Sequence, residues 1–290
     1  MRVAVIGAGI MGSGIAQLAA MHGHDVRLRD IGDAPLSRAR DAIDRSLERF
    51  AAKGRLSEEE VADTRDRLRV TTDLGEAVAD ADVVVEAVPE ILDLKREVFD
   101  EITAKAPEGS LLGTNTSQLS ITSIASGLGD AAARVVGMHF FNPPVLMQLC
   151  ELIRGLETTD EAVEEARVFA ESIGKTVVVC QKDSPGFITS RAYAILRLEC
   201  LRMLEEGVAS AEDIDTAMKL GFNFPMGPLE LGDFNGLDTY LHAIESLERV
   251  HGDRFKPTVS LRNMVASGRL GRKSGRGFYR YDDLGNRVTE

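Results

Sequence analysis

A histidine and a glutamate twelve residues apart are the side chains best suited to acid–base chemistry. His139 ends one apolar run, and Glu151 lies inside a second run, Leu149–Ile153. A charge within an apolar strand is costly unless it is paired. Asn142-Pro143-Pro144 predicts a chain reversal, so residues 139 and 151 face one another if the runs pair as antiparallel strands about Val145. A carboxylate beside an imidazole raises its basicity, which suits a base that takes a proton from an alcohol.

A glycine-rich turn near the start of the chain predicts a dinucleotide site. The turn consists of Gly7, Gly9, Ile10, Met11 and Gly12. Gly7 permits the tight bend, Gly9 lets the backbone approach a pyrophosphate, and Gly12 lets the following helix pack on the preceding strand. The helix N-terminus offers N–H groups to the phosphates. Without this motif, a structural His–Glu pair in a core would be the better interpretation; with it, we favour catalysis.

Asp30 predicts that the cofactor is NAD. It ends the second predicted strand, eighteen residues after Gly12. A carboxylate at this position accepts hydrogen bonds from both ribose hydroxyls of NAD and repels the 2′-phosphate of NADP. Arg29 is adjacent and would soften that discrimination.

Short apolar runs that alternate with helical periodicity must position these residues. The predicted strands are Val3–Ile6, Val26–Leu28, Val83–Glu86, Ser110–Thr114, Val135–His139, Leu149–Ile153 and Thr176–Cys180. Strand–helix alternation predicts an α/β fold: a Rossmann-type, mostly parallel sheet with helices on both faces. Residues 33–69 are predicted to be a helical insertion.

The pattern changes at Asp183-Ser184-Pro185-Gly186, which predicts a helix start. We therefore predict an NAD-binding domain over residues 1–183 and a second, all-α domain over residues 184–290, whose first helix reaches about Glu206. Apolar side chains lie on more than one face of that helix. A central helix of its own domain and a homodimer interface explain this pattern equally well.

Composition limits the location and the partners. The chain has 290 residues and a net charge of −12, which argues against nucleic acid as a partner. Its apolar runs are strand-length, which argues against a membrane span. A strand begins almost at Met1, so no secretory signal is expected. The cysteines Cys150, Cys180 and Cys200 lack metal-ligand spacing and predict buried thiols in a reducing cytoplasm.

The chain resembles the 3-hydroxyacyl-CoA dehydrogenase family, in particular its short 3-hydroxybutyryl-CoA type. The resemblance rests on GAGIMGSGIA (7–16), EAVPE (86–90), NTSQLSI (115–121), HFFNP (139–143), DSPGF (183–187), EDIDTAMKLGFNFPMGPLEL (212–231), GLDT (236–239) and LGRKSGRGFY (270–279). These motifs cover essentially the whole chain in the family's order. The resemblance implies reversible oxidation of a (3S)-3-hydroxyacyl thioester to the 3-ketoacyl thioester with NAD.

The resemblance also implies roles for individual residues. His139 matches the family's catalytic base, and Glu151 matches the partner of that base. Ser117 matches a serine that hydrogen-bonds the reacting oxygen. The other implied residues are Glu90 and Asn115 on the cofactor side and Asn142 on the substrate side.

The sequence departs from the family's pattern at three places near the expected substrate channel: at Ser190, in the proline spacing of Asn142-Pro143-Pro144, and at Asn235, where an apolar residue is usual. Ser190 stands where the family has an asparagine that reaches the substrate, and serine is shorter and lacks the separate donor and acceptor of an amide. The acyl group is therefore open. 3-Hydroxybutyryl-CoA is the leading candidate. The alternatives are a thioester on an acyl carrier protein, as in polyketide extender-unit synthesis, and a sugar acid, as in the lambda-crystallin lineage.

A CoA-like ligand needs cations, and the insertion offers some. Arg38, Arg45, Arg49 and Lys53 cluster on one flank of its first helix. We take Arg49 and Lys53 as candidates for binding phosphates of CoA or of a phosphopantetheine arm. Acidic residues are interspersed among them, so a solvated face of mixed charge is the alternative.

Overall fold

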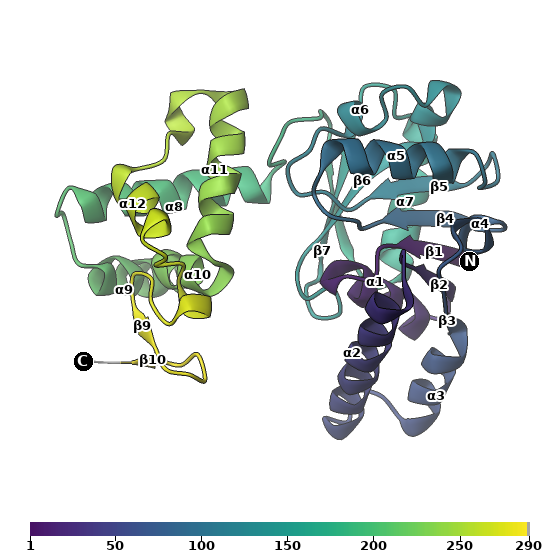
Figure 1. The fold of residues 1–290 in the computed structure, drawn as a ribbon, viewed down its shortest axis with the longest axis horizontal. Coiled ribbons are helices and arrows are strands. Elements are labelled where there is room, and N and C mark those ends of the chain that lie inside the picture. Colours follow the sequence, from purple (N-terminus) through teal and green to yellow (C-terminus); the bar gives the residue numbers. More distant parts are fainter. Residues whose placement is uncertain (289–290) are drawn as a thin grey trace. The chain divides into compact units, whose positions relative to one another are not determined.

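The structure, a computed structural model that describes residues 1–288, divides into two units (Figure 1). The first unit is Met1–Phe187, and the second begins at Ile188. The predicted domain boundary after residue 183 lies just before this division.

The first unit is built around an eight-stranded sheet in the order β3-β2-β1-β4-β5-β6-β7-β8. The strands are β1 (Arg2–Ile6), β2 (Asp25–Arg29), β3 (Leu68–Thr71), β4 (Val83–Glu86), β5 (Leu111–Thr114), β6 (Val135–Phe140), β7 (Leu149–Arg154) and β8 (Thr176–Cys180). All neighbouring pairs are parallel except β6 and β7. The predicted, mostly parallel sheet is confirmed. Its edge strand β3 was not predicted, because only one of its four residues is buried.

Helices cover both faces of this sheet, as predicted. They are α1 (Ile10–Met21), α2 (Asp33–Ala52), α3 (Glu58–Arg67), α4 (Leu74–Val78), α5 (Leu92–Thr103), α6 (Ile121–Ile124), the 3-10 helix η1 (Gly129–Arg134) and α7 (Asp160–Ser172). In β1, Val3 and Val5 pack with α1, α2 and α7, whereas Ala4 and Ile6 pack with α4, α5 and α6. Alternate side chains of a strand thus serve two cores, and this explains why the buried strands read as continuous apolar runs.

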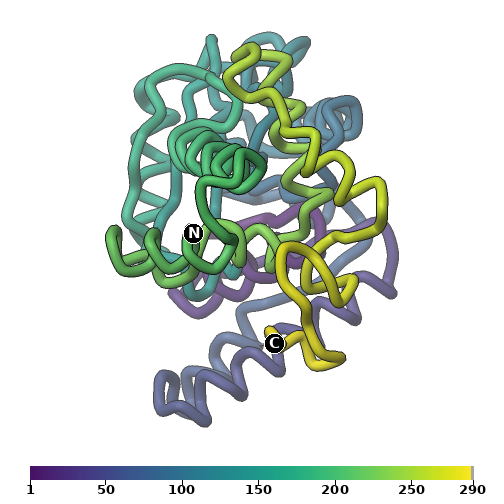
Figure 2. Tube along the Cα trace, turned by 90° about the vertical axis from the view of Figure 1, so that its left-hand side faces the viewer, coloured from purple at the N-terminus to yellow at the C-terminus, as the bar shows by residue number. Residues whose placement is uncertain are grey.

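The helical insertion is a pair of helices, α2 and α3. They lie side by side and extend beyond the sheet in both views (Figures 1 and 2). The apolar side chains of α2 are buried at Leu36, Ala39, Ile43 and Leu47. The predicted end of the insertion at residue 69 is wrong, because Leu68 already pairs with Val26 and begins β3.

The predicted helix start at the Asp-Ser-Pro-Gly segment is also wrong. Helix α8 runs from Thr189 to Glu205. Gly186 and Phe187 have φ angles of 81° and 47°, and this left-handed conformation cannot belong to a right-handed helix. Asp183, the first residue of that segment, does not cap a helix and instead accepts a hydrogen bond from the Ser120 hydroxyl at 2.6 Å.

The second unit is helical, as predicted, with a short hairpin that was not predicted. Its elements are α8, α9 (Ala211–Phe222), α10 (Pro228–Asn235), α11 (Leu237–His251), η2 (Asp253–Phe255), α12 (Val259–Ala266), η3 (Arg272–Ser274), β9 (Arg280–Tyr281) and β10 (Arg287–Val288). The buried Asp233 of α10 accepts hydrogen bonds from the amides of Phe278 and Tyr279, at 3.0 and 2.9 Å. It thereby ties the hairpin segment to the helices. Among residues 1–288, no helix is both long and apolar enough to span a membrane.

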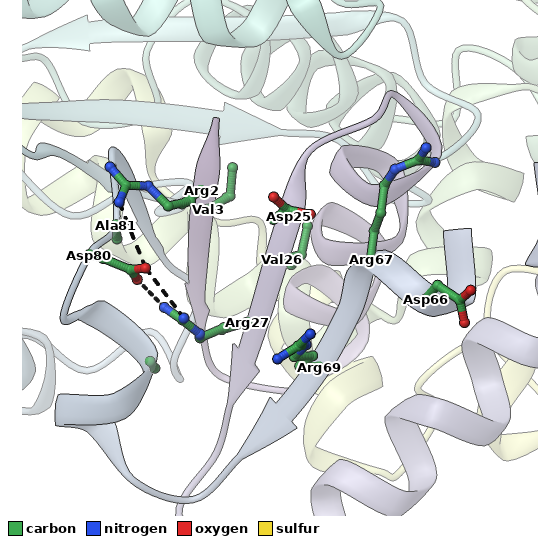
Figure 3. A pocket seen from close by; sticks show the side chains of 11 residues that line it. Arg2, Val3, Asp25, Val26, Arg27, Asp66, Arg67, Arg69, Asp80 and Ala81 are labelled. Carbon is green, nitrogen blue, oxygen red and sulfur yellow. Dashed lines mark hydrogen bonds and ion pairs between the residues drawn. The ribbon is translucent and has the colours of Figure 1, made fainter. Parts of the chain in front are cut away.

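A separate cavity of about 230 Å³ lies at the amino ends of β1, β2 and β3. Arg2 and Arg27 both pair with Asp80 across it (Figure 3). These ion pairs are partly exposed, so each stabilises the fold only a little. The cavity is at the opposite strand ends from the glycine turn, and it is therefore not part of the dinucleotide site.

Candidate active site

The glycine turn between β1 and α1 is packed so tightly that two of its glycines admit no side chain. Gly7 has a φ of 107°, and a Cβ there would lie 2.6 Å from the Ala87 oxygen. A Cβ on Gly12 would lie 1.8 Å from the Gly7 oxygen. Gly9 is different, because its Cβ would meet no atom within 4 Å. Gly7 and Gly12 are thus needed for packing, and Gly9 leaves open space where a ligand can approach the backbone.

The N-terminus of α1 faces this open space without a protein cap. No side chain caps the helix, and Ile10 is 75% exposed. Asp30, at the end of β2, accepts hydrogen bonds from the amides of Ala8 and Ile31 at 2.7 and 2.8 Å. The carboxylate therefore holds the glycine turn in addition to the role predicted for it with the ribose.

A cavity of about 820 Å³ joins these groups. It is lined from the turn by Gly7, Ala8, Gly9, Ile10, Met11 and Ser13, and further on by Arg29, Asp30, Ile31, Arg38 and Ala87–Pro89. An open helix N-terminus, a glycine without close neighbours and a carboxylate at the next strand end are the groups that an NAD site needs, so these residues fit the cofactor. Residues 1–288 contain no group of His, Cys, Asp and Glu side chains that could hold a metal ion.

A fully buried ion pair joins the end of β4 to helix α5. Lys95 Nζ lies 2.7 Å from Glu86 Oε1, and both side chains are 0% exposed. Glu86 also accepts from the Val88 amide at 2.7 Å and from the Thr114 hydroxyl at 2.6 Å. Burial raises the pKa of Glu86, and the neighbouring Lys95 ammonium opposes that shift. The Glu86 carboxylate thus ties β4 to α5 through Lys95 and to β5 through Thr114.

Glu90 organises the loop that carries Ser117. Its Oε1 accepts hydrogen bonds from the Thr116 hydroxyl and from the amides of Ser117 and Gln118, at 2.5, 2.9 and 3.2 Å. Its other oxygen lies 3.7 Å from Lys95 Nζ. Ser117 is exposed, so its hydroxyl is available to a ligand. No side chain caps α5, whose cap residue is Ile91.

His139 and Glu151 face one another on adjacent strands, as their spacing predicted. They are register partners in the antiparallel pair of β6 and β7. His139 Nδ1 lies 2.8 Å from Glu151 Oε2, and the two residues are 5% and 0% exposed. The imidazole also contacts the rings of Phe141 and Phe187, with centroids 4.5 and 5.6 Å away. An imidazole held in this way by a buried carboxylate and aromatic rings has a fixed orientation.

The same edge of the sheet carries Asn115 and Asn142. The Asn115 side-chain oxygen accepts a hydrogen bond from the Phe140 amide at 3.0 Å, which joins the Ser117 loop to the strand of His139. Asn142 is exposed at the start of the β6–β7 reversal. The loops after β1, β4, β5 and β6 all leave the carboxyl edge of the parallel strands, where open α/β sheets bind ligands.

Family models match both halves of the chain. Residues 2–184 match the model described as 3-hydroxyacyl-CoA dehydrogenase, NAD binding domain, and residues 186–281 match that family's C-terminal domain. The chain belongs to the 3-hydroxyacyl-CoA dehydrogenase family. The predicted family, oxidoreductase class and NAD cofactor are thereby confirmed.

Other members of the 3-hydroxyacyl-CoA dehydrogenase family are similar over almost their full length. A probable 3-hydroxybutyryl-CoA dehydrogenase of Deinococcus radiodurans is 44% identical over 282 residues, covering 97% of this chain and 100% of the relative. The mitochondrial hydroxyacyl-coenzyme A dehydrogenase of Homo sapiens is 40% identical, covering 96% and 90%. The crystal structure of (S)-3-hydroxybutyryl-CoA dehydrogenase PaaH1 from Ralstonia eutropha has a TM-score of 0.93 at 40% identity, covering 97% and 99%.

Three residues that were predicted to bind the substrate do not lie at the sheet edge that carries His139. One is in the second unit of this dehydrogenase, and two are at the end of α2. Ser190 is half-buried in the first turn of α8, in the second unit. Arg49 lies in the last turn of α2, and Lys53 is the cap residue after it; both are exposed. The first unit thus brings His139, Glu151, Ser117, Glu90, Asn115 and Asn142 to the same sheet edge as the glycine turn.

Two buried lysines near the site were missed from the sequence. Lys95 stands in an amphipathic helix, where a lysine normally points to solvent. Lys175 follows the end of α7 and is 7% exposed. The only signal for Lys95 was Glu86 at the end of an apolar strand, since a buried carboxylate requires a partner.

Proposed function

We propose that the chain interconverts a (3S)-3-hydroxyacyl thioester and its 3-ketoacyl thioester with NAD, and that 3-hydroxybutyryl-CoA is the substrate. The observation that carries this proposal is the buried contact of 2.8 Å between His139 and Glu151, at the same sheet edge as the open glycine turn. The names of the relatives from Deinococcus radiodurans and Ralstonia eutropha support the four-carbon acyl group.

In the proposed mechanism, His139 is the general base. Ser117 and His139 hold the 3-hydroxyl group, and the imidazole removes its proton. Glu151 stabilises the imidazolium that forms. Bound NAD supplies the acceptor for the hydride that leaves C3. Glu90 acts by holding the Ser117 loop, Asn115 joins that loop to the strand of His139, and Asn142 and Ser190 contact the substrate.

The first test is turnover of acetoacetyl-CoA, followed by NADH absorbance. We expect consumption of NADH and only weak consumption of NADPH, at least about tenfold lower in kcat/KM, because the Asp30 carboxylate repels the 2′-phosphate. A clear preference for NADPH would overturn the role of Asp30. The proposed substrate would be wrong if acetoacetyl-CoA is not turned over but one of the alternatives is. Those alternatives are the same acyl group on an acyl carrier protein and a sugar acid.

Arg49 and Lys53 are proposed to bind the phosphates of CoA. The carboxylates nearest to them along α2 are engaged elsewhere: Asp44 and Glu48 pair with Arg65 of α3, at 2.6 and 3.8 Å. No ion pair involves Arg49 or Lys53 within the described part of the chain. These pairings favour an anion site over the alternative of a solvated face of mixed charge.

Charge reversal tests this patch. We expect R49E/K53E to raise the KM for acetoacetyl-CoA roughly tenfold, since each lost phosphate contact removes a charge-assisted interaction. The KM for NADH should stay unchanged. K105E is the matched control, because Lys105 is exposed and lies after α5. An unchanged KM for the thioester in R49E/K53E would refute the patch.

We also propose that residues 1–183 form the NAD-binding domain and that residues 184–290 serve the substrate and homodimer contact. Exposed apolar side chains of the second unit, such as Leu220 at 82% and Phe222 at 70%, support a covered face. Light scattering at low concentration tests the dimer, and a strict monomer would exclude it.

Cys150, Cys180 and Cys200 are buried thiols, in keeping with a reducing cytoplasm.

A further inference from the structure

Lys175 is a buried lysine that holds the reversal between the strands of His139 and Glu151. Its Nζ donates hydrogen bonds to the backbone oxygens of Pro144 and Met147, each at 2.5 Å. The residue is 7% exposed and stands immediately before β8. Burial lowers the pKa of its ammonium group. A lysine accepts such a location only when specific acceptors replace water.

The reversal depends on this ammonium for two of its backbone oxygens. Within the segment, the Pro143 oxygen accepts from the amides of Leu146 and Met147, both at 3.0 Å. The Gln148 oxygen accepts from the Thr176 amide at 2.8 Å, at the start of the β7–β8 pairing. The oxygens of Pro144 and Met147 receive their hydrogen bonds from Lys175. One side chain thus binds both halves of the turn.

Helix α1 also contacts the reversal, through Gly14. A Cβ on Gly14 would lie 2.8 Å from Cδ of Pro144, so the proline ring fits against the bare backbone of the helix. The segment is therefore fixed from two directions. Lys175 attaches its carbonyl groups, and Gly14 admits its proline ring.

We propose that Lys175 is a positioning residue for the reaction. Its ammonium group fixes the turn at residues 142–148 and through it the register that sets Glu151 opposite His139. A turn determines the register of the strands it joins, and a slip of one residue moves every side chain to the other face of the sheet. Lys175 also sets the location of Asn142 at the start of the same turn. The proposal rests on the proposed function only for the roles of His139, Glu151 and Asn142 in the reaction.

The test replaces Lys175 with methionine, which keeps the length of the side chain and removes its charge. We expect the amides of Leu146 and Met147, which donate to the Pro143 oxygen, to exchange hydrogen about ten- to a hundredfold faster, because two carbonyls of the same turn lose a charged donor. We expect kcat with acetoacetyl-CoA to fall by a similar factor, with an unchanged KM for NADH. K105M is the control, and it should match the wild type in all three measurements.

Hydrogen exchange separates this proposal from the proposed function, because it needs no turnover. Unchanged exchange in K175M would overturn the positioning role even if the enzyme proves to be the proposed dehydrogenase. Equal losses of kcat and of NADH affinity would also overturn it, since they indicate general damage. If K175M does not fold, G14A perturbs the same turn by pushing on Pro144. We then expect a several-fold lower kcat with an unchanged KM for NADH, and wild-type kinetics in G14A would overturn the proposal.

Discussion

Replacement of His139 with glutamine should lower kcat by about 10²- to 10⁴-fold, the contribution of a positioned general base. This corresponds to about 3–5 kcal/mol of transition-state stabilisation. Glutamine is polar and similar in size, so it keeps a hydrogen bond to Glu151 but cannot take up the proton of an alcohol. The dinucleotide groups lie on other loops, and the dissociation constant of NADH, measured by fluorescence titration, should therefore stay near the wild-type value.

The matched control is H242Q, because His242 is an exposed histidine of α11. It should retain full activity. Substantial residual turnover in H139Q, at more than a tenth of the wild-type kcat, would remove His139 from the mechanism. Loss of NADH binding together with turnover would instead show that the substitution disturbs the fold of the site.

Replacement of Lys95 with methionine should lower the free energy of unfolding by about 3–5 kcal/mol, because it leaves the Glu86 carboxylate buried without its cation. For a chain of this size the midpoint of thermal unfolding should fall by about 10 °C. Differential scanning calorimetry measures this change. K105M removes an exposed lysine and should leave the midpoint within about 2 °C.

The pH dependence of K95M identifies the cause. Burial already raises the pKa of Glu86, and without the ammonium only the hydrogen bonds from Thr114 and Val88 oppose that shift. A carboxyl group whose pKa is higher in the folded state than in the unfolded state favours folding at low pH, and this advantage is lost as pH rises through the folded pKa. The fall in the unfolding midpoint caused by K95M should therefore be smaller at pH 5.5 than at pH 8. The double variant K95M/E86Q, which has no buried charge, should recover part of the midpoint at pH 8. An equal deficit at both pH values would contradict this explanation.

The elements of the site that depend on local pattern were predictable from the sequence. The glycine turn needs only a strand, three glycines and a helix in order. The alignment of His139 with Glu151 follows from a proline-containing turn and two strands of period two, since a turn centred between them leaves one possible register.

The elements that depend on distant contacts were not predictable. Lys95 stands in a helix whose periodicity would normally expose a lysine, and its burial depends on Glu86 from another element. The start of α8 was misplaced because the Asp183 carboxylate binds Ser120 instead of the helix N-terminus. A local capping signal cannot reveal that a competing donor lies more than sixty residues away.

The antiparallel orientation of β7 has a consequence for how the acid–base pair assembles. A parallel neighbour of β6 would require a crossover connection of a dozen or more residues. The hairpin instead closes a loop of eight residues between Phe140 and Leu149 at small entropic cost. The contact between His139 and Glu151 is therefore short-range in sequence and can form early during folding. The glycine turn is completed only after β1 pairs with the distant strand β4.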